Sequence, residues 1–236
     1  MLKSIDIKNL NLTIDKNKIF TNLNCSLAEG SFNTVIGLSG AGKTQLLRTL
    51  ADLNHKYQPS PVKGSCISFV FQKSSLFNWL TVFENLRIIT RRPDSDITNW
   101  LEKVHLAAYS DKYPHQLSTG MQQKINLLRA FLVKAPLVLL DEPFSGLDHA
   151  NKLHLYEQLL NLWREQRATI LFVTHDIHEA LILSENIFLL SKKSQTFTKS
   201  FAIPFPHPRK IAESPFVEFY NKNYYEIEKF LVDDLV

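Results

Sequence analysis

The stretch GLSGAGKT combines glycines, a lysine and a threonine at the spacing that surrounds a phosphate group. Its three glycines allow the backbone to curl, so that successive N–H groups point inward around an anion. Lys43 supplies a compact charge for the terminal phosphates, and the Thr44 hydroxyl is suited to Mg²⁺. A glycine-rich turn without a ligand is the alternative, but every position of the pattern is matched. We therefore predict a triphosphate-binding loop made of Gly37, Leu38, Ser39, Gly40, Ala41, Gly42, Lys43 and Thr44.

Two adjacent carboxylates, Asp141 and Glu142, follow the apolar run at 137–140. Such a run is typical of a buried strand, and ligands of open α/β sheets lie at the carboxyl ends of strands. We expect Asp141 to hold Mg²⁺ opposite the phosphate loop, and Glu142 to orient or deprotonate the attacking water. An acidic pair alone would indicate a solvated strand end. Together with the complete phosphate loop it predicts Mg²⁺-dependent nucleotide hydrolysis.

The elements that must position these residues alternate between apolar strands and helices. We expect strands at 2–14, 31–37, 66–72, 137–142, 168–175 and 186–192, and helices at 43–53, 151–166 and 176–183. This alternation predicts a mainly parallel sheet with helices on its faces. Residues 73–131 have helical patterns instead, which indicates an inserted helical subdomain.

The C-terminal part begins with a proline-rich linker at 203–210. Ser214 and Pro215 are typical of an N-cap and a first helical turn. An aromatic and aliphatic stripe follows at helical spacing, and we expect it to pack against the main body: Phe216, Phe219, Tyr220, Tyr224, Ile227 and Leu231. We therefore divide the chain into a nucleotide-hydrolysing domain at 1–202, with its helical subdomain at about 73–131, and a linker and helix at 203–236.

Composition limits the other classes of function. The 236 residues carry a net charge of +4 and no dense basic block with interleaved aromatics, so we expect no nucleic-acid partner. The two cysteines, Cys25 and Cys66, do not form a metal-binding pattern. The apolar runs are shorter than the ~18 residues that a membrane helix needs. We therefore expect a soluble chain that reaches a membrane only by docking to another protein.

Further residues give the phosphate loop a specific context. Gln72 ends a strand, LSTGMQQ at 117–123 opens a helix, SGLD at 145–148 follows the acidic pair, and His175 ends the next strand. This order resembles the ATP-binding cassette (ABC) ATPases over the chain from its first strand to the histidine region. The resemblance implies ATP and Mg²⁺ as ligands. It also implies an α/β P-loop NTPase core with a mainly parallel sheet, an N-terminal antiparallel β subdomain and an inserted helical subdomain.

The resemblance also assigns roles to individual residues. Glu142, His175 and Gln72 would be catalytic, with Gln72 joining Thr44 and Asp141 at Mg²⁺. His175 would contact the γ-phosphate. Ser118 and Gly120 would contact the γ-phosphate of ATP held by a second copy, and Asp148 would line the seam of this head-to-tail ATP-sandwich dimer. We interpret the neighbouring His178 as a surface residue.

Two segments resemble the nitrate/taurine/sulfonate type of importer ATPase: FQKSSLFNWLTVFENL at 71–86 and FPHPRKIAESPFVEFY at 205–220. A methionine at the position of Met121, within LSTGMQQ, is also common in that type of ATPase. The resemblance implies an ATPase subunit that powers uptake of such a small solute through a membrane permease docked near 73–86. A solute-binding protein would be an indirect partner, and the location would be the cytoplasmic face of the inner membrane. The alternatives are a lipid-transport or non-transport ABC ATPase and, from another class, a P-loop kinase.

Three departures from the family pattern carry expectations of their own. Thr119 stands where the signature motif of the family, LSTGMQQ at 117–123 in this chain, has its first glycine, and its β-branched side chain could slow dimer closure. The adenine-stacking aromatic position falls near Ile14. Phe20 lies close to it, and we favour apolar packing over adenine contact for Phe20. The segment between Lys43 and Gln72 lacks a glycine-bounded hairpin, so we expect it to cross directly.

Overall fold

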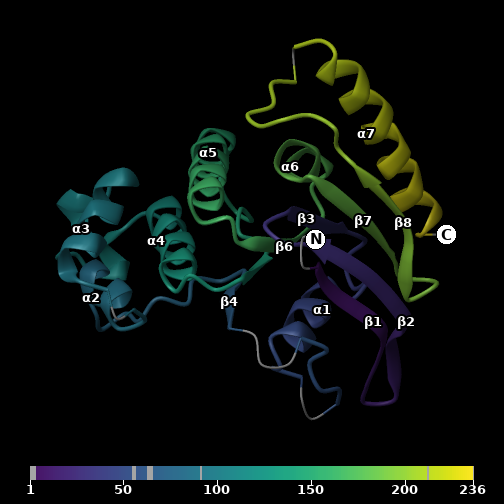
Figure 1. Ribbon diagram of the computed structural model, residues 1–236, viewed down its shortest axis with the longest axis horizontal. Coiled ribbons are helices and arrows are strands. Elements are labelled where there is room, and N and C mark those ends of the chain that lie inside the picture. The colour runs from purple at the N-terminus through teal and green to yellow at the C-terminus, as the bar shows by residue number, and fades with distance from the viewer. Residues whose placement is uncertain (1–3, 55–56, 63–65, 91, 212, 236) are drawn as a thin grey trace.

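The computed structural model describes residues 4–54, 57–62, 66–90, 92–211 and 213–235. Figure 1 shows a central sheet with helices on both faces, a long hairpin below it and a group of helices to one side. The strands are β1 (Ser4–Ile14), β2 (Asn17–Ala28), β3 (Phe32–Ile36), β4 (Ile67–Val70), β5 (Leu137–Asp141), β6 (Thr169–Thr174), β7 (Asn186–Ser191) and β8 (Thr196–Ala202). The helices are α1 (Lys43–Leu50), α2 (Val82–Arg87), α3 (Asp94–Lys103), α4 (Thr119–Leu132), α5 (His149–Gln166), α6 (Ile177–Leu183) and α7 (Phe216–Asp233).

The central sheet has six strands in the order β4-β5-β6-β3-β7-β8. Its strands are parallel except for β8, which pairs antiparallel with β7. The expected mainly parallel sheet is thus confirmed. Because β3 lies next to β6, and β6 next to β5, the carboxyl ends of these three strands meet at one edge. The phosphate loop follows β3, His175 follows β6, and Asp141 is the last residue of β5.

Successive residues of a strand point to opposite faces, and both faces of this sheet are covered. On β5, Leu137 and Leu139 pack in the cluster formed with α1, β1 and β2. Val138 and Leu140 pack in the cluster that contains α4 and α5. All five residues of β5 are buried, which is why the strand is continuously apolar up to its terminal aspartate.

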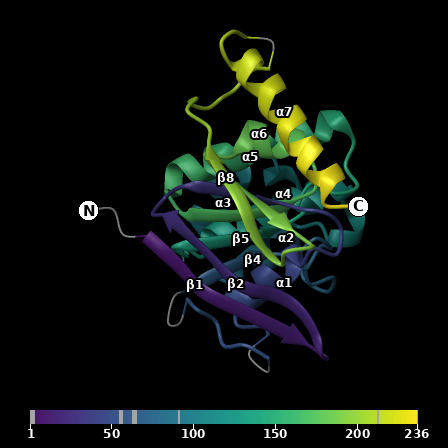
Figure 2. The ribbon, with the colours of Figure 1, turned by 90° about the vertical axis from the view of Figure 1, so that its right-hand side faces the viewer.

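The N-terminal strands form a separate antiparallel pair, as expected. The second of them, β2, was not located from its sequence, and neither was β8. Both carry polar residues on an exposed face, which hides the alternation of the buried positions. Figure 2 shows this pair low in the view, below α7 and below β8, the edge strand of the central sheet. Between α1 and β4, the described residues contain no helix or strand, in line with the direct crossing.

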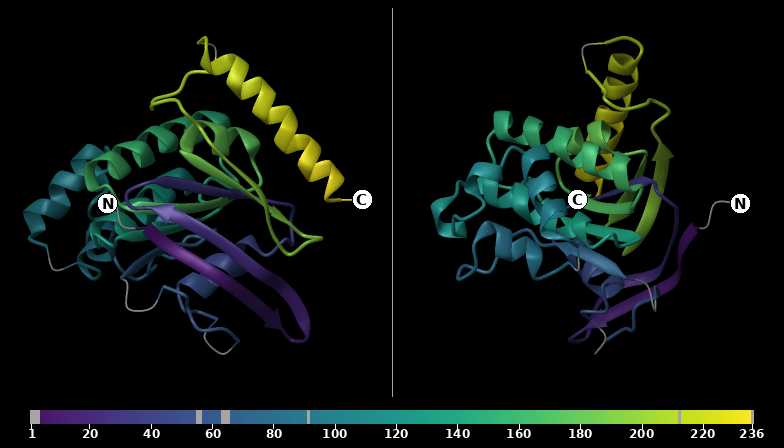
Figure 3. Two further views of the ribbon diagram at one scale, coloured as in Figure 1. Left: turned by 45° about the vertical axis from the view of Figure 1, so that its right-hand side comes forward. Right: turned by 60° about the vertical axis from the view of Figure 1, so that its left-hand side comes forward.

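The helical subdomain contains α2, α3 and α4, and it projects from the sheet in both views of Figure 3. Helix α2 begins with a capping box between Thr81 and Glu84. The fully buried Asn85 binds the backbone N–H and C=O of Phe77 and the C=O of Leu80. These bonds fix the 77–81 loop, on which Trp79 is 72% exposed.

Helix α7 packs along α6 and β7, as the aromatic stripe predicted, and Phe216 and Ile227 are buried there. The helix begins at Phe216 with Pro215 as its N-cap, and Ser214 lies one residue before that position. The expected serine cap was therefore wrong by one residue. Within the described residues, no helix is long and apolar enough to cross a lipid bilayer.

Candidate functional site

The phosphate loop turns from the end of β3 into α1. Gly40 and Gly42 have φ angles of 79° and 97°, in the left-handed region that favours glycine. Helix α1 begins at Lys43, so its free N–H groups and positive end face the loop. The Lys43 ammonium group donates to the carbonyls of Gly37, at 2.8 Å, and Leu38, at 3.0 Å. A triphosphate offers charged oxygens, which bind an ammonium group more strongly than these neutral carbonyls.

Lys43 and Asp141 are both buried at the base of the loop. Burial lowers the pKa of Lys43, while the negative charges of Glu142 and Asp141 act in the opposite direction. Burial raises the pKa of Asp141, and a hydrogen bond from Thr44 opposes that shift. This bond joins the Thr44 hydroxyl to Asp141 Oδ1 at 3.0 Å. A hydroxyl and a carboxylate side by side are oxygen ligands that suit Mg²⁺ next to phosphates.

Three side chains that come just after the ends of β4, β5 and β6 meet beside this pair. His175 Nδ1 lies 3.1 Å from Glu142 Oε2, and Gln72 Nε2 lies 3.4 Å from the same oxygen. The backbone of Glu142 has a φ of 43°, and its N–H donates to the carbonyl of Val173. A left-handed residue at a strand end is strained, and such strain is found most often at functional sites. The three residues predicted to be catalytic are therefore neighbours in the fold.

These groups surround a pocket of about 580 Å³. It is lined by Ile19, Ser39, Gly40, Gly42, Lys43, Thr44, Gln45, Gln72, Glu142 and His175. Ile19 and Gln45 were not among the predicted residues. Gln45 directly follows the motif, whereas Ile19 comes from β2, whose position only the fold reveals. Phe20, next to Ile19, is 2% exposed, which agrees with packing as its role.

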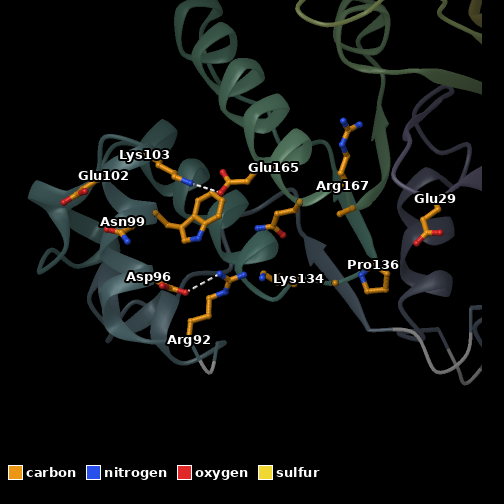
Figure 4. A pocket seen from close by; sticks show the side chains of 14 residues that line it. Glu29, Arg92, Asp96, Asn99, Glu102, Lys103, Lys134, Pro136, Glu165 and Arg167 are labelled. Carbon is orange, nitrogen blue, oxygen red and sulfur yellow. Dashed lines mark hydrogen bonds and ion pairs between the residues drawn. The ribbon is translucent and has the colours of Figure 1, made fainter. Parts of the chain in front are cut away.

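A larger hollow of about 820 Å³ lies at the opposite end of the sheet, against the residues that precede β5 and β6. Two ion pairs join charged residues of its lining: Arg92 pairs with Asp96, and Lys103 with Glu165 (Figure 4). The smaller pocket is the one lined by the predicted phosphate-loop and catalytic residues, and it is therefore the candidate nucleotide pocket.

The predicted signature residues lie outside the lining of the nucleotide pocket. Ser118 is the N-cap of α4 and accepts a hydrogen bond from the Met121 N–H at 3.3 Å. Thr119 is exposed, and Gly120 is buried against the Asn151 side chain. Asp148 is the N-cap of α5 and accepts a bond from the Asn151 N–H at 3.0 Å. The structure thus separates Ser118, Gly120 and Asp148 from the chain's own phosphate loop.

His178 is not the surface residue that was expected. It is half-buried between α6 and α7, where Nδ1 lies 3.1 Å from the Tyr220 hydroxyl. Burial lowers its pKa. The error arose because α7 is distant in the sequence, so the local pattern around His178 does not reveal the helix that covers it.

Comparisons with known proteins give a consistent result. A family model described as ABC transporter matches residues 20–145. The chain is 36% identical over 228 residues to the aliphatic sulfonates import ATP-binding protein SsuB of Bacillus cereus, which covers 90% of this chain and 89% of that protein. It is 34% identical over 226 residues to the Bacillus subtilis protein with the same description, with coverage of 91% and 89%.

Among solved structures, the chain is similar to the dimeric structure of MJ0796, a bacterial ABC transporter cassette. The TM-score is 0.71 at 24% identity, and the match covers 85% of this chain and 99% of that one. A post-hydrolysis dimer of the same cassette bound to ADP and Pi also gives a TM-score of 0.71, with 86% of this chain and 100% of that chain covered. The expected P-loop NTPase fold is confirmed by these neighbours.

Proposed function

The chain belongs to the ABC transporter family, and we propose on that premise that it is the ATP-hydrolysing subunit of an importer for aliphatic sulfonates or similar small anions. Two relatives named for aliphatic sulfonate import match about nine-tenths of this chain, which supports that class of solute. The observation that best supports ATP hydrolysis is that the side chains of Gln72, Glu142 and His175 lie together in the pocket that Lys43 also lines.

Hydrolysis needs a base for water and positive groups around the transferred phosphoryl group. Gln72 and His175 both contact Oε2 of Glu142. We assign the other carboxylate oxygen, Oε1, to the attacking water, which it orients and deprotonates. Lys43 and the loop N–H groups bind the phosphate oxygens as charge moves onto the leaving group. His175 stabilises the γ-phosphate from the side opposite the loop.

Thr44, Asp141 and Gln72 are the residues that would hold Mg²⁺. The contact of Thr44 with Asp141 places two hard oxygen ligands at the base of the pocket, and Gln72 is one of the residues that line it. When bound, Mg²⁺ neutralises phosphate charge and fixes the geometry of the β- and γ-phosphates.

The signature residues complete the site in a second copy of the chain. Ser118 begins a helix of 14 residues, so the positive end of α4 is directed at a site outside its own nucleotide pocket. In a head-to-tail dimer, Ser118 and Gly120 of one copy would face the γ-phosphate bound to Lys43 of the other. Asp148 would lie along the seam between the copies.

The 73–86 segment is the proposed docking surface for the permease. It carries the exposed Trp79 on a loop held by Asn85, and the ring of Phe77 lies 5.2 Å from that of Trp79. A fixed aromatic on a rigid loop is a typical interface anchor. Gln72 lies just before this segment and touches Glu142, so docking and hydrolysis share one short stretch of chain. The subunit would therefore work at the cytoplasmic face of the inner membrane.

The Glu142→Gln variant tests the assignment of the base. It keeps the shape of the side chain but removes proton acceptance, so ATP affinity should persist while hydrolysis falls by about 10²-fold or more. Steady-state phosphate release and titration with a fluorescent ATP analogue measure the two quantities. Glu157→Gln, on the exposed face of α5, is the matched control. Normal turnover in Glu142→Gln would show that Glu142 is not the base for the attacking water.

The solute class is tested separately in membrane vesicles that contain the co-purifying permease and solute-binding protein. ATP-dependent uptake of radiolabelled alkanesulfonate should exceed that of nitrate. Uptake of neither anion, by a complex that still hydrolyses ATP, would leave the ATPase assignment intact and contradict the proposed solute.

A further inference from the structure

A buried carboxylate that plays no part in the hydrolysis scheme accepts a hydrogen bond from the residue before His175. Glu179, on α6, is 3% exposed. Its Oε2 accepts a hydrogen bond from the Thr174 hydroxyl at 2.6 Å, and its Oε1 accepts bonds from Lys152 Nζ at 2.8 Å and the Tyr156 hydroxyl at 3.4 Å. Burial raises the pKa of Glu179, and the bonds from Lys152 and Thr174 oppose that shift. A carboxylate at this depth depends on its partners to remain charged.

The contacts of Glu179 and Lys152 fall on both sides of His175. The Thr174 hydroxyl, which donates to Glu179, also accepts from the Asp176 N–H at 3.0 Å. Lys152 reaches Asp176 Oδ2 at 3.1 Å as well as Glu179. The side chain of His175 itself is 66% exposed, so surrounding atoms hold it only weakly. Its direction toward Glu142 therefore depends on the backbone at 174–176.

Lys152 comes from the first turn of α5, which begins after Asp148. The Lys152 N–H donates to the Asp148 carbonyl at 3.0 Å. In the same turn, Asn151 Oδ1 lies 3.5 Å from the point where a Cβ on Gly120 would stand. One helical turn thus contacts the signature helix on one side and the His175 segment on the other.

We propose that Lys152 and Glu179 are positioning residues for hydrolysis. Lys152 clamps the 174–176 segment through Asp176 and Glu179, and the clamp keeps the imidazole of His175 against Glu142. Neither Lys152 nor Glu179 lines the nucleotide pocket, so both act through His175 and not on ATP itself. This inference rests on the proposed ATPase activity of the same site.

The main test compares Lys152→Met with Lys152→Arg. Methionine keeps the length and packing of the side chain but removes both ion pairs, whereas arginine can restore them. For Lys152→Met we expect kcat to fall about tenfold or more with KM within about twofold, because a small misplacement of a catalytic group has effects of this size. Lys152→Arg should recover most of the rate. Lys103→Met breaks the exposed 2.7 Å pair with Glu165 and should leave kcat unchanged.

A second measurement separates positioning from a general loss of stability. The His175→Ala variant is measured by single-turnover hydrolysis with enzyme in excess over ATP. Adding Lys152→Met to this variant should lower its remaining rate by less than about twofold, because the effects of residues that act as a unit are not additive. A further drop as large as in the parent protein would overturn the proposal. So would an unchanged kcat in Lys152→Met, or no recovery with arginine.

Glu179→Gln provides an independent route if circular dichroism shows that Lys152→Met is unfolded. This change keeps the size of the side chain, removes its charge and replaces one of the two acceptor oxygens with an NH2 donor. A folded Glu179→Gln protein should show the same loss of kcat at constant KM, and wild-type turnover would refute the clamp. Failure of the ATPase function itself gives a different result, since the wild-type chain would then show no hydrolysis that Glu142→Gln removes.

Discussion

Replacing Arg209 should destabilise the chain strongly, because this side chain donates hydrogen bonds to the free carbonyls at the C-terminal end of α6. Arg209 is 8% exposed, and its Nη1 donates to the carbonyls of Leu181, at 3.1 Å, and Ile182, at 3.3 Å. It also donates to the carbonyls of Phe205 and Ser184. Carbonyls in the last turn of a helix have no partner within the helix. The linker at 203–210 therefore acts as a cap for α6.

The size of the effect follows from these bonds. Hydrogen bonds from charged donors contribute about 1.5–3 kcal/mol each, but those of a single group are not additive. Water can reach some of the freed carbonyls, so we expect Arg209→Met to lower the free energy of unfolding by about 3 kcal/mol. For a chain of this length, that corresponds to a decrease in Tm of about 6–12 °C. Arg209→Lys should recover only part of the loss, since lysine lacks the planar fork of donors.

The assay is urea unfolding followed by circular dichroism and by tryptophan fluorescence. Trp163 lies 5.5 Å from the ring of His207, so its emission reports on the linker directly. Arg164→Met, an exposed arginine on α5, is the control and should change stability by less than about 0.5 kcal/mol. A loss below about 1 kcal/mol for Arg209→Met would refute the capping argument.

Two further predictions concern the linker and the phosphate loop. Burial and the charge of Arg209 lower the pKa of His207 to about 4, so the folded chain keeps it neutral where the unfolded chain, with a pKa near 6.5, takes up a proton. The stability that comes from keeping His207 neutral in the fold is fully present above pH 6.5, and it is lost as the pH falls toward 4. His207→Gln should therefore flatten the decrease of Tm between pH 6.5 and 4, whereas the exposed His154→Gln should not, and equal slopes would contradict the reasoning. In Gly42→Ala, the new Cβ would lie 2.8 Å from Ile19 Cγ2 on a backbone with φ of 97°, so ATP affinity should fall about tenfold or more in a nucleotide titration. Wild-type affinity would show that the loop tolerates a side chain there.

The sequence alone indicated the chemistry that we propose for the site, because the residues that carry it lie in short, contiguous patterns. The glycines, Lys43 and Thr44 lie within eight residues, and Asp141 and Glu142 directly follow an apolar strand. Each local pattern carries both its residue types and the element that presents them. The mainly parallel sheet follows from the same alternation of strands and helices. Polar, half-exposed strands such as β2 and β8 lack this signal, and they were recognised only in the structure.

Tertiary structure decided everything that depends on distant segments meeting. The strand order places the ends of β3, β5 and β6 side by side, which brings His175 to 3.1 Å from Glu142 across 33 residues of chain (175 − 142). Packing of α7 buries His178, and the first turn of α5 brings Lys152 to Glu179. These contacts are set by how helices cover the two faces of the sheet, and no local pattern of residue types records that arrangement.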